Sequence, residues 1–230
     1  MILRMRHPYL KGIFMILCNG CSKTGTHILT IYAKAIGLSQ VGGTLIKRHP
    51  KATLKTTSIK LIKDIMAHDN GHFMHCHVSY TNNLRQRLIV GEHKMIHIIR
   101  HPRNVAVSWM RHRNKQNPDI EVSTDSLKEL IQGKMFNMSV PDHYKGFLKW
   151  VHTPEVLTVR FEDVFENSDK VFSQMSAFIG IDGCPKPEDV FGHGVTNNDK
   201  KSTWQEWWDE DVDFVWREAG GIELEGALGY

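Results

Sequence analysis

The chain has 230 residues, of which 41% are hydrophobic and 23% are charged, and this composition excludes a disordered or fibrous protein. No apolar run approaches the roughly 18 residues of a membrane-spanning helix, and four cysteines are too few for a disulfide scaffold. Residues 1–63 hold 11 Lys/Arg and no acid, whereas 18 Lys/Arg and 25 Asp/Glu give residues 64–230 a charge of −7. This basic first quarter favours an anionic ligand such as phosphate, sulfate or nucleic acid, with a solvated basic face as the alternative.

Apolar runs alternate with segments of helical period along the chain, which is the pattern of β–α–β units in a parallel sheet. The first run, Ile13–Cys18, predicts a buried strand, because six residues are too few for the apolar part of an export signal. A turn over 19–25 then leads into a helix whose apolar residues recur every three or four positions as far as Gly37.

Three later runs, 72–78, 95–99 and 156–161, predict further strands of the same sheet. Helices are expected from Pro102 to about Arg111, from an N-cap at Ser168 to Gly180, and after the acidic start of a last helix at 209–213. The polar stretches 39–70 and 114–150 are interpreted as insertions and helices over this sheet. We therefore predict a single α/β domain spanning residues 1–230, with a parallel β-sheet flanked by helices.

The turn after the first strand contains small residues and one lysine, Lys23. Such a turn directs backbone N–H groups and a helix dipole toward one point, which is the geometry of a phosphate cradle. The segment is not a Walker A loop, because Lys23 precedes Gly25 instead of following it. An ordinary turn with a surface lysine remains the alternative for this loop taken alone.

The segment Ser22–Ile28 resembles the P-K-S-G-T-T-W loop of sulfotransferases that use 3′-phosphoadenosine 5′-phosphosulfate (PAPS). The resemblance implies a P-loop NTPase-like fold and a loop that holds the 5′-phosphosulfate end of the donor. The residues that it places on the nucleotide here are Lys23, Thr24, Gly25, Thr26 and His27. The sequence departs from the family at Ile28, which stands where the family often has a tryptophan that stacks on adenine.

The segment Ile98–Trp109 is similar to the family's R-[ND]-P-x-[DN]-x-x-x-S segment, whose arginine and serine bind the nucleotide 3′-phosphate. This likeness assigns the 3′-phosphate to Arg100 and Ser108, and a guanidinium suits a phosphate because it donates two parallel hydrogen bonds. The resemblance further implies that Phe161 lies near the adenine, with core packing as the alternative. It also implies that a C-terminal loop with Lys200, Lys201 and Trp204 covers the cofactor.

Sulfuryl transfer needs a cation for the leaving group and a base for the acceptor, and it needs no metal. The resemblance makes Lys23 the cation. It makes His77 the base, because Met74–Ser79 occupies the place of the family's K-T-H-L-P stretch, and His75 is the reserve candidate. The implied cosubstrate is PAPS and the implied product is PAP, the desulfated nucleotide.

Three alternatives stay open beside this interpretation. A P-loop kinase of a small molecule would need ATP and Mg²⁺, and a nucleic-acid-binding domain would use the basic residues of 1–63. A zinc site would draw on a CxxC pair and a cluster of histidines, namely Cys18, Cys21, His72, His75, Cys76 and His77. We expect no metal, no membrane partner, an unidentified small-molecule or carbohydrate acceptor, and a cytoplasmic location. The sequence carries no signal for an oligomeric state.

Overall fold

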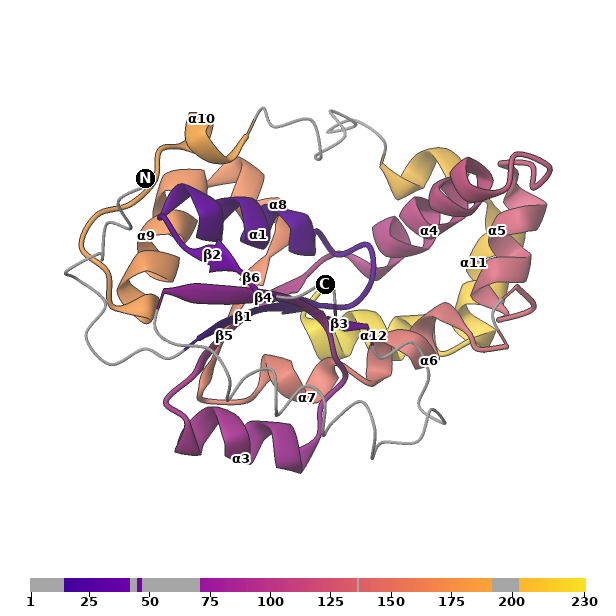
Figure 1. Cartoon of the computed structure of the whole chain (residues 1–230). Helices are drawn as coiled ribbons and strands as arrows, with labels where there is room; N and C mark the ends of the chain where they lie inside the picture. The colour runs from indigo at the N-terminus through magenta and orange to yellow at the C-terminus, as the bar shows by residue number, and fades with distance from the viewer. Residues whose placement is uncertain (1–14, 42–44, 47–70, 136, 192–202) are drawn as a thin grey trace.

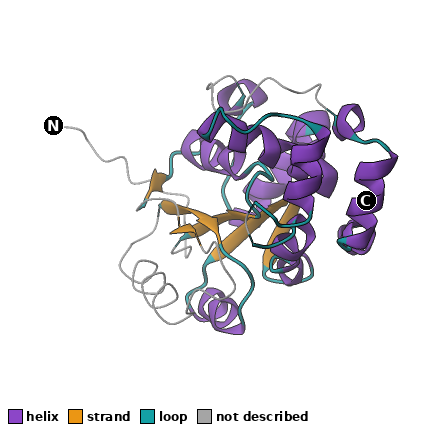
Figure 2. Ribbon diagram, turned by 90° about the vertical axis from the view of Figure 1, so that its right-hand side faces the viewer, coloured by secondary structure: helices purple, strands orange, loops and turns teal. Residues whose placement is uncertain are grey.

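A parallel sheet forms the centre of the computed structural model, which describes residues 15–41, 45–46, 71–135, 137–191 and 203–230. The strands are β1 (Ile16–Gly20), β2 (Ser39–Gln40), β3 (Leu45–Ile46), β4 (His72–His77), β5 (Lys94–Ile99) and β6 (Val156–Arg160). The order is β2-β4-β1-β5-β6, all neighbours are parallel, and β3 also pairs with β4. Helices cover the sheet on both sides (Figure 2), which confirms the predicted α/β class.

The first strand lies further along the chain than predicted. Every residue from Ile16 to Gly20 is buried, because a central parallel strand has neighbours on both edges and helices on both faces. The strand continues through the polar Asn19 because its amide is fully used: Nδ2 donates to the Val78 carbonyl at 3.1 Å, and Oδ1 accepts from the Val78 N–H at 2.9 Å. Asn19 thereby fastens the end of β4 to β1.

The helices form two layers and a third group beyond one end of the sheet (Figure 1). They are α1 (Thr26–Ala35), α3 (Asn82–Val90), α4 (Pro102–Gln116), α5 (Thr124–Ile131), α6 (Val140–Lys145), α7 (Leu148–Val151), α8 (Phe161–Glu166), α9 (Ser168–Ile179), α10 (Pro187–Val190), the 3-10 helix η1 (Trp204–Trp207), α11 (Glu210–Glu218) and α12 (Gly221–Leu228). One core joins the sheet to α1, α8, α9 and α10, and a second joins it to α3, α7 and the helices from α4 to α6 with α11 and α12.

Several predicted boundaries shift for local reasons. The helix from Pro102 continues past Arg111 to Gln116, because the next helix-breaking residue is Pro118. Asn167 occupies the N-cap that was predicted for Ser168, which is instead the first helical residue. The strand expected to end at Phe161 ends one residue earlier, because Phe161 begins α8.

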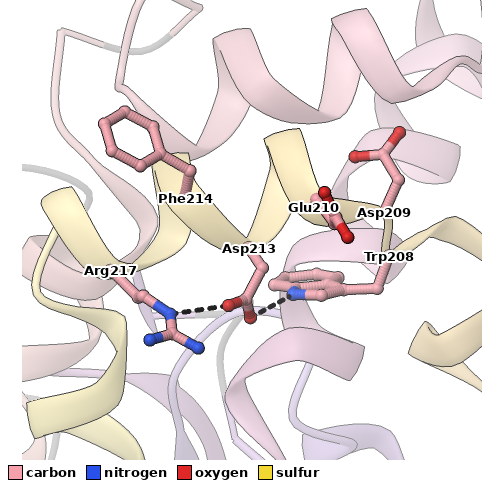
Figure 3. Close-up of a pocket in the computed structure, with 6 residues that line it drawn as sticks. All are labelled: Trp208, Asp209, Glu210, Asp213, Phe214 and Arg217. Atoms are coloured by element: carbon pink, nitrogen blue, oxygen red, sulfur yellow. Dashed lines mark hydrogen bonds and ion pairs between the residues drawn. The ribbon is translucent and has the colours of Figure 1, made fainter.

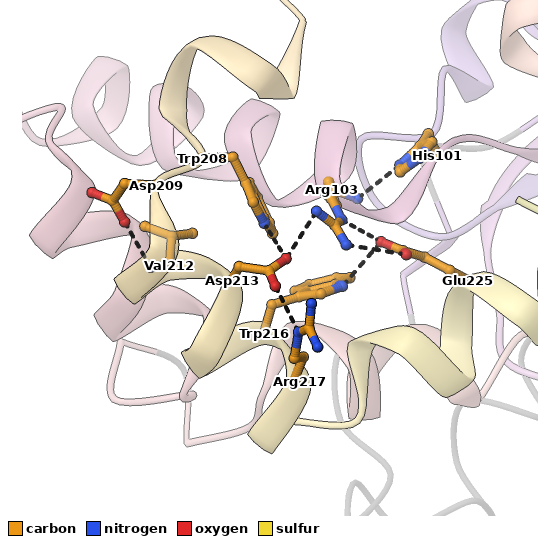
Figure 4. A network of polar contacts seen from close by, with 9 residues as sticks. All are labelled: His101, Arg103, Trp208, Asp209, Val212, Asp213, Trp216, Arg217 and Glu225. Carbon is orange, nitrogen blue, oxygen red and sulfur yellow. Dashed lines mark hydrogen bonds and ion pairs between the residues drawn. The ribbon is translucent and has the colours of Figure 1, made fainter.

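A network of ion pairs ties α4 to the C-terminal helices (Figure 4). Arg103 donates from Nε to Glu225 at 2.6 Å and pairs with Asp213 at 3.1 Å, and its side chain is only 12% exposed. Trp216 Nε1 donates to Glu225 at 3.0 Å. Because α12 supplies Glu225 and α11 supplies Asp213, the start of α4 is held rigidly by two further helices. The predicted last helix is α11, and α12 follows it.

Candidate functional site

The loop after β1 lies at the point where the strand connections change direction. β1 runs between β4 and β5, and the helix that follows it packs on one face of the sheet, whereas α3, which leads from β4 to β5, packs on the other. Ligands of open α/β sheets bind at the carboxyl ends of the strands at such a switch point. The predicted phosphate loop occupies this position.

The loop has a conformation that directs donors toward one point. Lys23 and Gly25 both have left-handed backbones, with φ of 73° and 104°. Thr24 is buried, and its hydroxyl donates to the Cys21 carbonyl at 2.7 Å, so this side chain shapes the turn. Thr26 is buried at the start of α1, whose first turn has no acidic residue, and Gly25 offers no side chain to cap its N–H groups. Uncapped N–H groups at a helix start favour an anion.

Phe161 lies directly against this loop. A Cβ built on Gly25 would come within 2.5 Å of the Phe161 ring, and the Arg100 guanidinium lies over the same ring at 4.2 Å. The ring therefore supports both the glycine and the arginine. Phe161, which was predicted to contact the adenine, thus lies beneath the loop and Arg100.

Replacing Gly25 by alanine is expected to destabilise the protein beyond the backbone cost alone. A non-glycine residue at this φ costs about 1–3 kcal/mol, and the new Cβ would also displace Phe161. Gly183→Ala is the matched control, because Gly183 has φ of 90° and no neighbour within 4 Å of a built Cβ. Urea unfolding of both variants measures the difference, and equal losses of free energy would contradict the packing argument.

Arg100 is a partly buried cation that forms no ion pair with a carboxylate among the described residues, although the charge of Glu162 acts to raise its pKa. Its Nη1 donates to the Lys23 carbonyl at 3.4 Å, and its Nε is buried with no hydrogen-bond partner. Its backbone is held by Tyr144, whose hydroxyl accepts from the Arg100 N–H at 3.0 Å and donates to the Arg100 carbonyl at 3.2 Å. Burial lowers the pKa of Arg100, as it does that of Lys23. A desolvated guanidinium with an unused donor is suited to bind an anion.

The side of α4 that bears Ser108 faces the C-terminal segment. Four residues before Ser108, the Asn104 side chain accepts from the Trp204 N–H at 3.0 Å. The Trp204 ring stacks on His101 at 5.5 Å and lies under the Arg103 guanidinium at 4.4 Å. Trp204 thus packs over the start of α4, which follows Arg100 by two residues. Two further predicted residues, Lys200 and Lys201, lie outside the described residues.

The rings of three histidines, His27, His75 and His77, lie in a row next to the loop. The His75 ring lies between those of His27, at 4.9 Å, and His77, at 5.0 Å. His77 Nδ1 is 2.8 Å from the carbonyl oxygen of Gly20. Because a carbonyl only accepts, Nδ1 carries the proton, and the lone pair of the neutral ring is on Nε2. His75 is 4% exposed, and burial together with the charges of His77 and His27 lowers its pKa to about 3.

The zinc alternative finds no support in the geometry. Within the part of the chain that the structure describes, no group of three His, Cys, Asp or Glu side chains is placed to hold a metal ion. Cys18 and Cys21 are fully buried, and burial raises the pKa of both thiols, which disfavours the thiolate that zinc requires. Among the described helices, none is long and apolar enough to span a membrane.

Several residues that build the site were not predicted. The Gly20 carbonyl accepts a hydrogen bond from His77, and the Tyr144 hydroxyl accepts one from the Arg100 N–H. His101 caps α4 by accepting from the Arg103 N–H at 3.3 Å. The position of His101 before Pro102 was an available signal for a cap, although histidine is not among the preferred capping residues. No local signal exists for Tyr144, which comes from α6.

A hollow of about 490 Å³ lies on the surface of α11, apart from the predicted site (Figure 3). It is lined by Trp208, Asp209, Glu210, Asp213, Phe214 and Arg217. None of the predicted site residues lines it, and two of its four charged groups, Asp213 and Arg217, are paired with each other at 2.6 Å. The hollow therefore contributes no group to the phosphate loop or to the surroundings of Arg100.

Comparisons with known proteins agree with this geometry. The family model described as a sulfotransferase domain matches residues 6–210. Mouse sulfotransferase SULT7A1 complexed with PAP is 17% identical, with a TM-score of 0.61 over 93% of this chain and 88% of that one. Retinol dehydratase in complex with androsterone and inactive cofactor PAP is 14% identical, with a TM-score of 0.58 over 92% and 80%.

A sulfotransferase from Alicyclobacillus acidocaldarius is also 14% identical, with a TM-score of 0.59 over 93% of each chain. At identities this low, the TM-scores show a shared fold and nothing more specific. No curated protein matches the chain.

Proposed function

Because the chain belongs to the sulfotransferase domain family, we propose that it transfers the sulfuryl group of PAPS to a hydroxyl or amine of an acceptor. The observation that carries the proposal is Arg100, a partly buried cation that donates to the backbone of Lys23, keeps a buried Nε without a hydrogen-bond partner, and forms no ion pair with a described carboxylate. The site thus offers two anion-binding positions, and PAPS has two anionic ends. PAP in the solved neighbours supports the same nucleotide.

The two ends of the nucleotide are assigned to different elements. We place the 5′-phosphosulfate on the N–H groups of the loop and the start of α1, with Lys23 beside the bridging oxygen. We place the 3′-phosphate on Arg100 and Ser108, with Trp204 above the start of α4. The charge that develops on the bridging oxygen during transfer is then stabilised by a fixed cation, which acts strongly in a desolvated site.

His77 is proposed as the general base. The acceptor oxygen or nitrogen forms a bond to sulfur while the bond from sulfur to the bridging oxygen breaks, and that oxygen leaves with the electron pair as part of PAP. The acceptor proton passes to Nε2 of His77, because Nδ1 is held as a donor by the Gly20 carbonyl. This bond links the base directly to the loop that holds the donor.

The acceptor is proposed to be a small molecule or a carbohydrate. Retinol dehydratase, one of the structural neighbours, has been solved in complex with androsterone and in complex with retinol, so small-molecule acceptors are compatible with this fold. The cytoplasmic location and the single domain over residues 1–230 remain predictions.

Calorimetry with PAP, in the absence of metal, tests the nucleotide assignment, with ATP and Mg²⁺ as the comparison. We expect metal-independent binding of PAP that Arg100→Ala weakens by at least about 10-fold, because a phosphate then loses a charged partner. Binding of ATP with Mg²⁺ in place of PAP would support the kinase alternative instead. Binding of nucleic acid that falls steeply with salt and does not depend on PAP would support the nucleic-acid-binding alternative.

His77→Asn is expected to reduce kcat by about 10²–10⁴-fold while the affinity for PAP changes little. The asparagine amide retains an N–H donor for the Gly20 carbonyl and has no basic nitrogen. Steady-state kinetics with labelled PAPS and calorimetry with PAP measure the two effects, and the exposed His152, changed to asparagine, is the control. Full turnover in His77→Asn would transfer the role of base to another residue, His75 first.

A further inference from the structure

The segment after α12 turns back to the carboxyl end of β6 and carries Tyr230 (Figure 1). Arg160, the last residue of β6, donates from Nη2 to the carbonyls of Leu228 at 3.2 Å and of Gly229 at 2.9 Å. Gly229 has a left-handed backbone, with φ of 75°, and a Cβ built on it would come within 2.8 Å of the same nitrogen. The Arg160 guanidinium also lies over the Tyr230 ring, 4.6 Å from its centre. These contacts fix Tyr230 beside the turn from β6 into α8.

Glu162 in that turn is a carboxylate that lies next to Arg100 without pairing with it. It follows Phe161, whose ring lies under the Arg100 guanidinium at 4.2 Å. Its Oε1 accepts from the N–H of His101, the residue after Arg100, at 3.0 Å. Arg100 nevertheless forms no ion pair with Glu162 or with any other described carboxylate, and its Nε is buried without a hydrogen-bond partner. Something must therefore hold the Glu162 carboxylate away from the guanidinium.

The Tyr230 hydroxyl occupies the oxygen of Glu162 that His101 leaves free. Oη of Tyr230 donates to Oε2 of Glu162 at 2.7 Å, and the Tyr230 ring packs 4.9 Å from that of His101. Burial and the charge of Glu162 raise the pKa of Tyr230, so the hydroxyl keeps its proton and remains a donor. Both oxygens of Glu162 are thus bonded to groups other than Arg100, and the direction of the carboxylate is set from two sides.

We infer that Tyr230 is a positioning residue for the nucleotide: its hydroxyl holds the Glu162 carboxylate and thereby keeps Arg100 available for the 3′-phosphate of PAPS. This inference rests on the proposed function and deepens it. Without the hydroxyl, Oε2 of Glu162 would lose its donor in a partly buried setting, where an unpaired charge is costly. The carboxylate would then turn to the Arg100 guanidinium, and this ion pair would compete with the phosphate for the same donors.

The test is calorimetry with PAP on Tyr230→Phe, on Glu162→Gln and on the double variant. Tyr230→Phe removes only the hydroxyl and keeps the ring against His101 and Arg160, and we expect the affinity for PAP to fall at least about 10-fold. Glu162→Gln keeps an oxygen for the His101 N–H and has no charge to compete for Arg100, so it should bind PAP at least as tightly as the unmodified protein. In this background, Tyr230→Phe should change the affinity by less than about two-fold.

Tyr32→Phe is the matched control for the loss of one bonded tyrosine hydroxyl. Its Oη lies 2.7 Å from the Ser176 hydroxyl, between α1 and α9, and α9 contributes no residue to the assigned nucleotide site. We expect this variant to bind PAP with unchanged affinity. Urea unfolding of each variant separates a loss of stability from a loss of nucleotide affinity.

Three outcomes would overturn the inference. The first is an unchanged affinity for PAP in Tyr230→Phe. The second is an equal loss of affinity with and without Glu162→Gln, which would make the role of Tyr230 purely structural. The third, which needs no change at Tyr230, is weaker binding of PAP by Glu162→Gln alone. Failure of the unmodified protein to bind PAP would instead refute the proposed function, so the two failures are distinguishable.

Discussion

Lys23→Gly is expected to lower the rate of sulfuryl transfer by at least about 10²–10³-fold without unfolding the loop. Lys23 has a left-handed backbone, with φ of 73°, which glycine adopts without a steric cost. The substitution therefore removes the ammonium group and retains the path of the chain. Because the cation acts mainly on charge that develops during transfer, kcat should fall more than the affinity for PAP.

Kinetics with labelled PAPS and urea unfolding measure the two sides of this prediction. The free energy of unfolding should stay within about 1 kcal/mol of the unmodified value or rise, because backbone strain is relieved. Lys34→Ala, an exposed lysine in the last turn of α1, is the matched control for loss of one positive charge near the loop. A Lys23→Gly variant that retains more than a tenth of the activity would exclude Lys23 as the leaving-group cation.

The protein is expected to lose stability steeply as the pH falls below about 6.5, because buried histidines are held neutral in the folded state. His97 is 1% exposed and burial lowers its pKa from 6.5 to about 3, and the pKa of His75 is also about 3. A folded-state pKa below the unfolded one means that the stabilisation is complete above pH 6.5 and is lost on acidification. At pH 4.5 each such histidine lowers the free energy of unfolding by about 2.7 kcal/mol. This is a large share of the total free energy of unfolding of a typical protein, about 5–15 kcal/mol.

The variant His97→Phe removes one of these titrating histidines and so measures its contribution to the pH dependence of stability. His97 stacks on Phe147 with an interplanar angle of 7°, and its Nδ1 accepts from Asn19, which keeps its bond to the Val78 carbonyl when the ring changes. We expect urea unfolding at about pH 7.5 and 4.5 to show a smaller difference in free energy for this variant, by about 2–3 kcal/mol. Exposed His152, changed to phenylalanine, is the control. A free energy of unfolding in the unmodified protein that does not depend on pH would contradict the argument.

The class of fold and the phosphate loop were predictable because both depend on local patterns. Buried parallel strands produce continuous apolar runs, and a helix that packs on a sheet repeats its apolar residues every three or four positions. The loop could be predicted because Ser22–Ile28 resembles the sulfotransferase loop and stands between an apolar run and a segment of helical period, whereas its small residues and Lys23 alone also fit an ordinary turn. The stop at Gly180, where φ is 81°, was likewise local, because glycine adopts this conformation at a helix end without strain.

The sequence by itself thus determined the type and order of most elements and the residues that carry charge in the site. Only the tertiary structure decided how these residues are used. The bond from His77 to the Gly20 carbonyl spans 57 positions, and the one between Tyr144 and Arg100 spans 44, so neither has a local pattern. Such contacts depend on strand order and helix packing, in which burial and the need to satisfy every buried polar group select one arrangement from many.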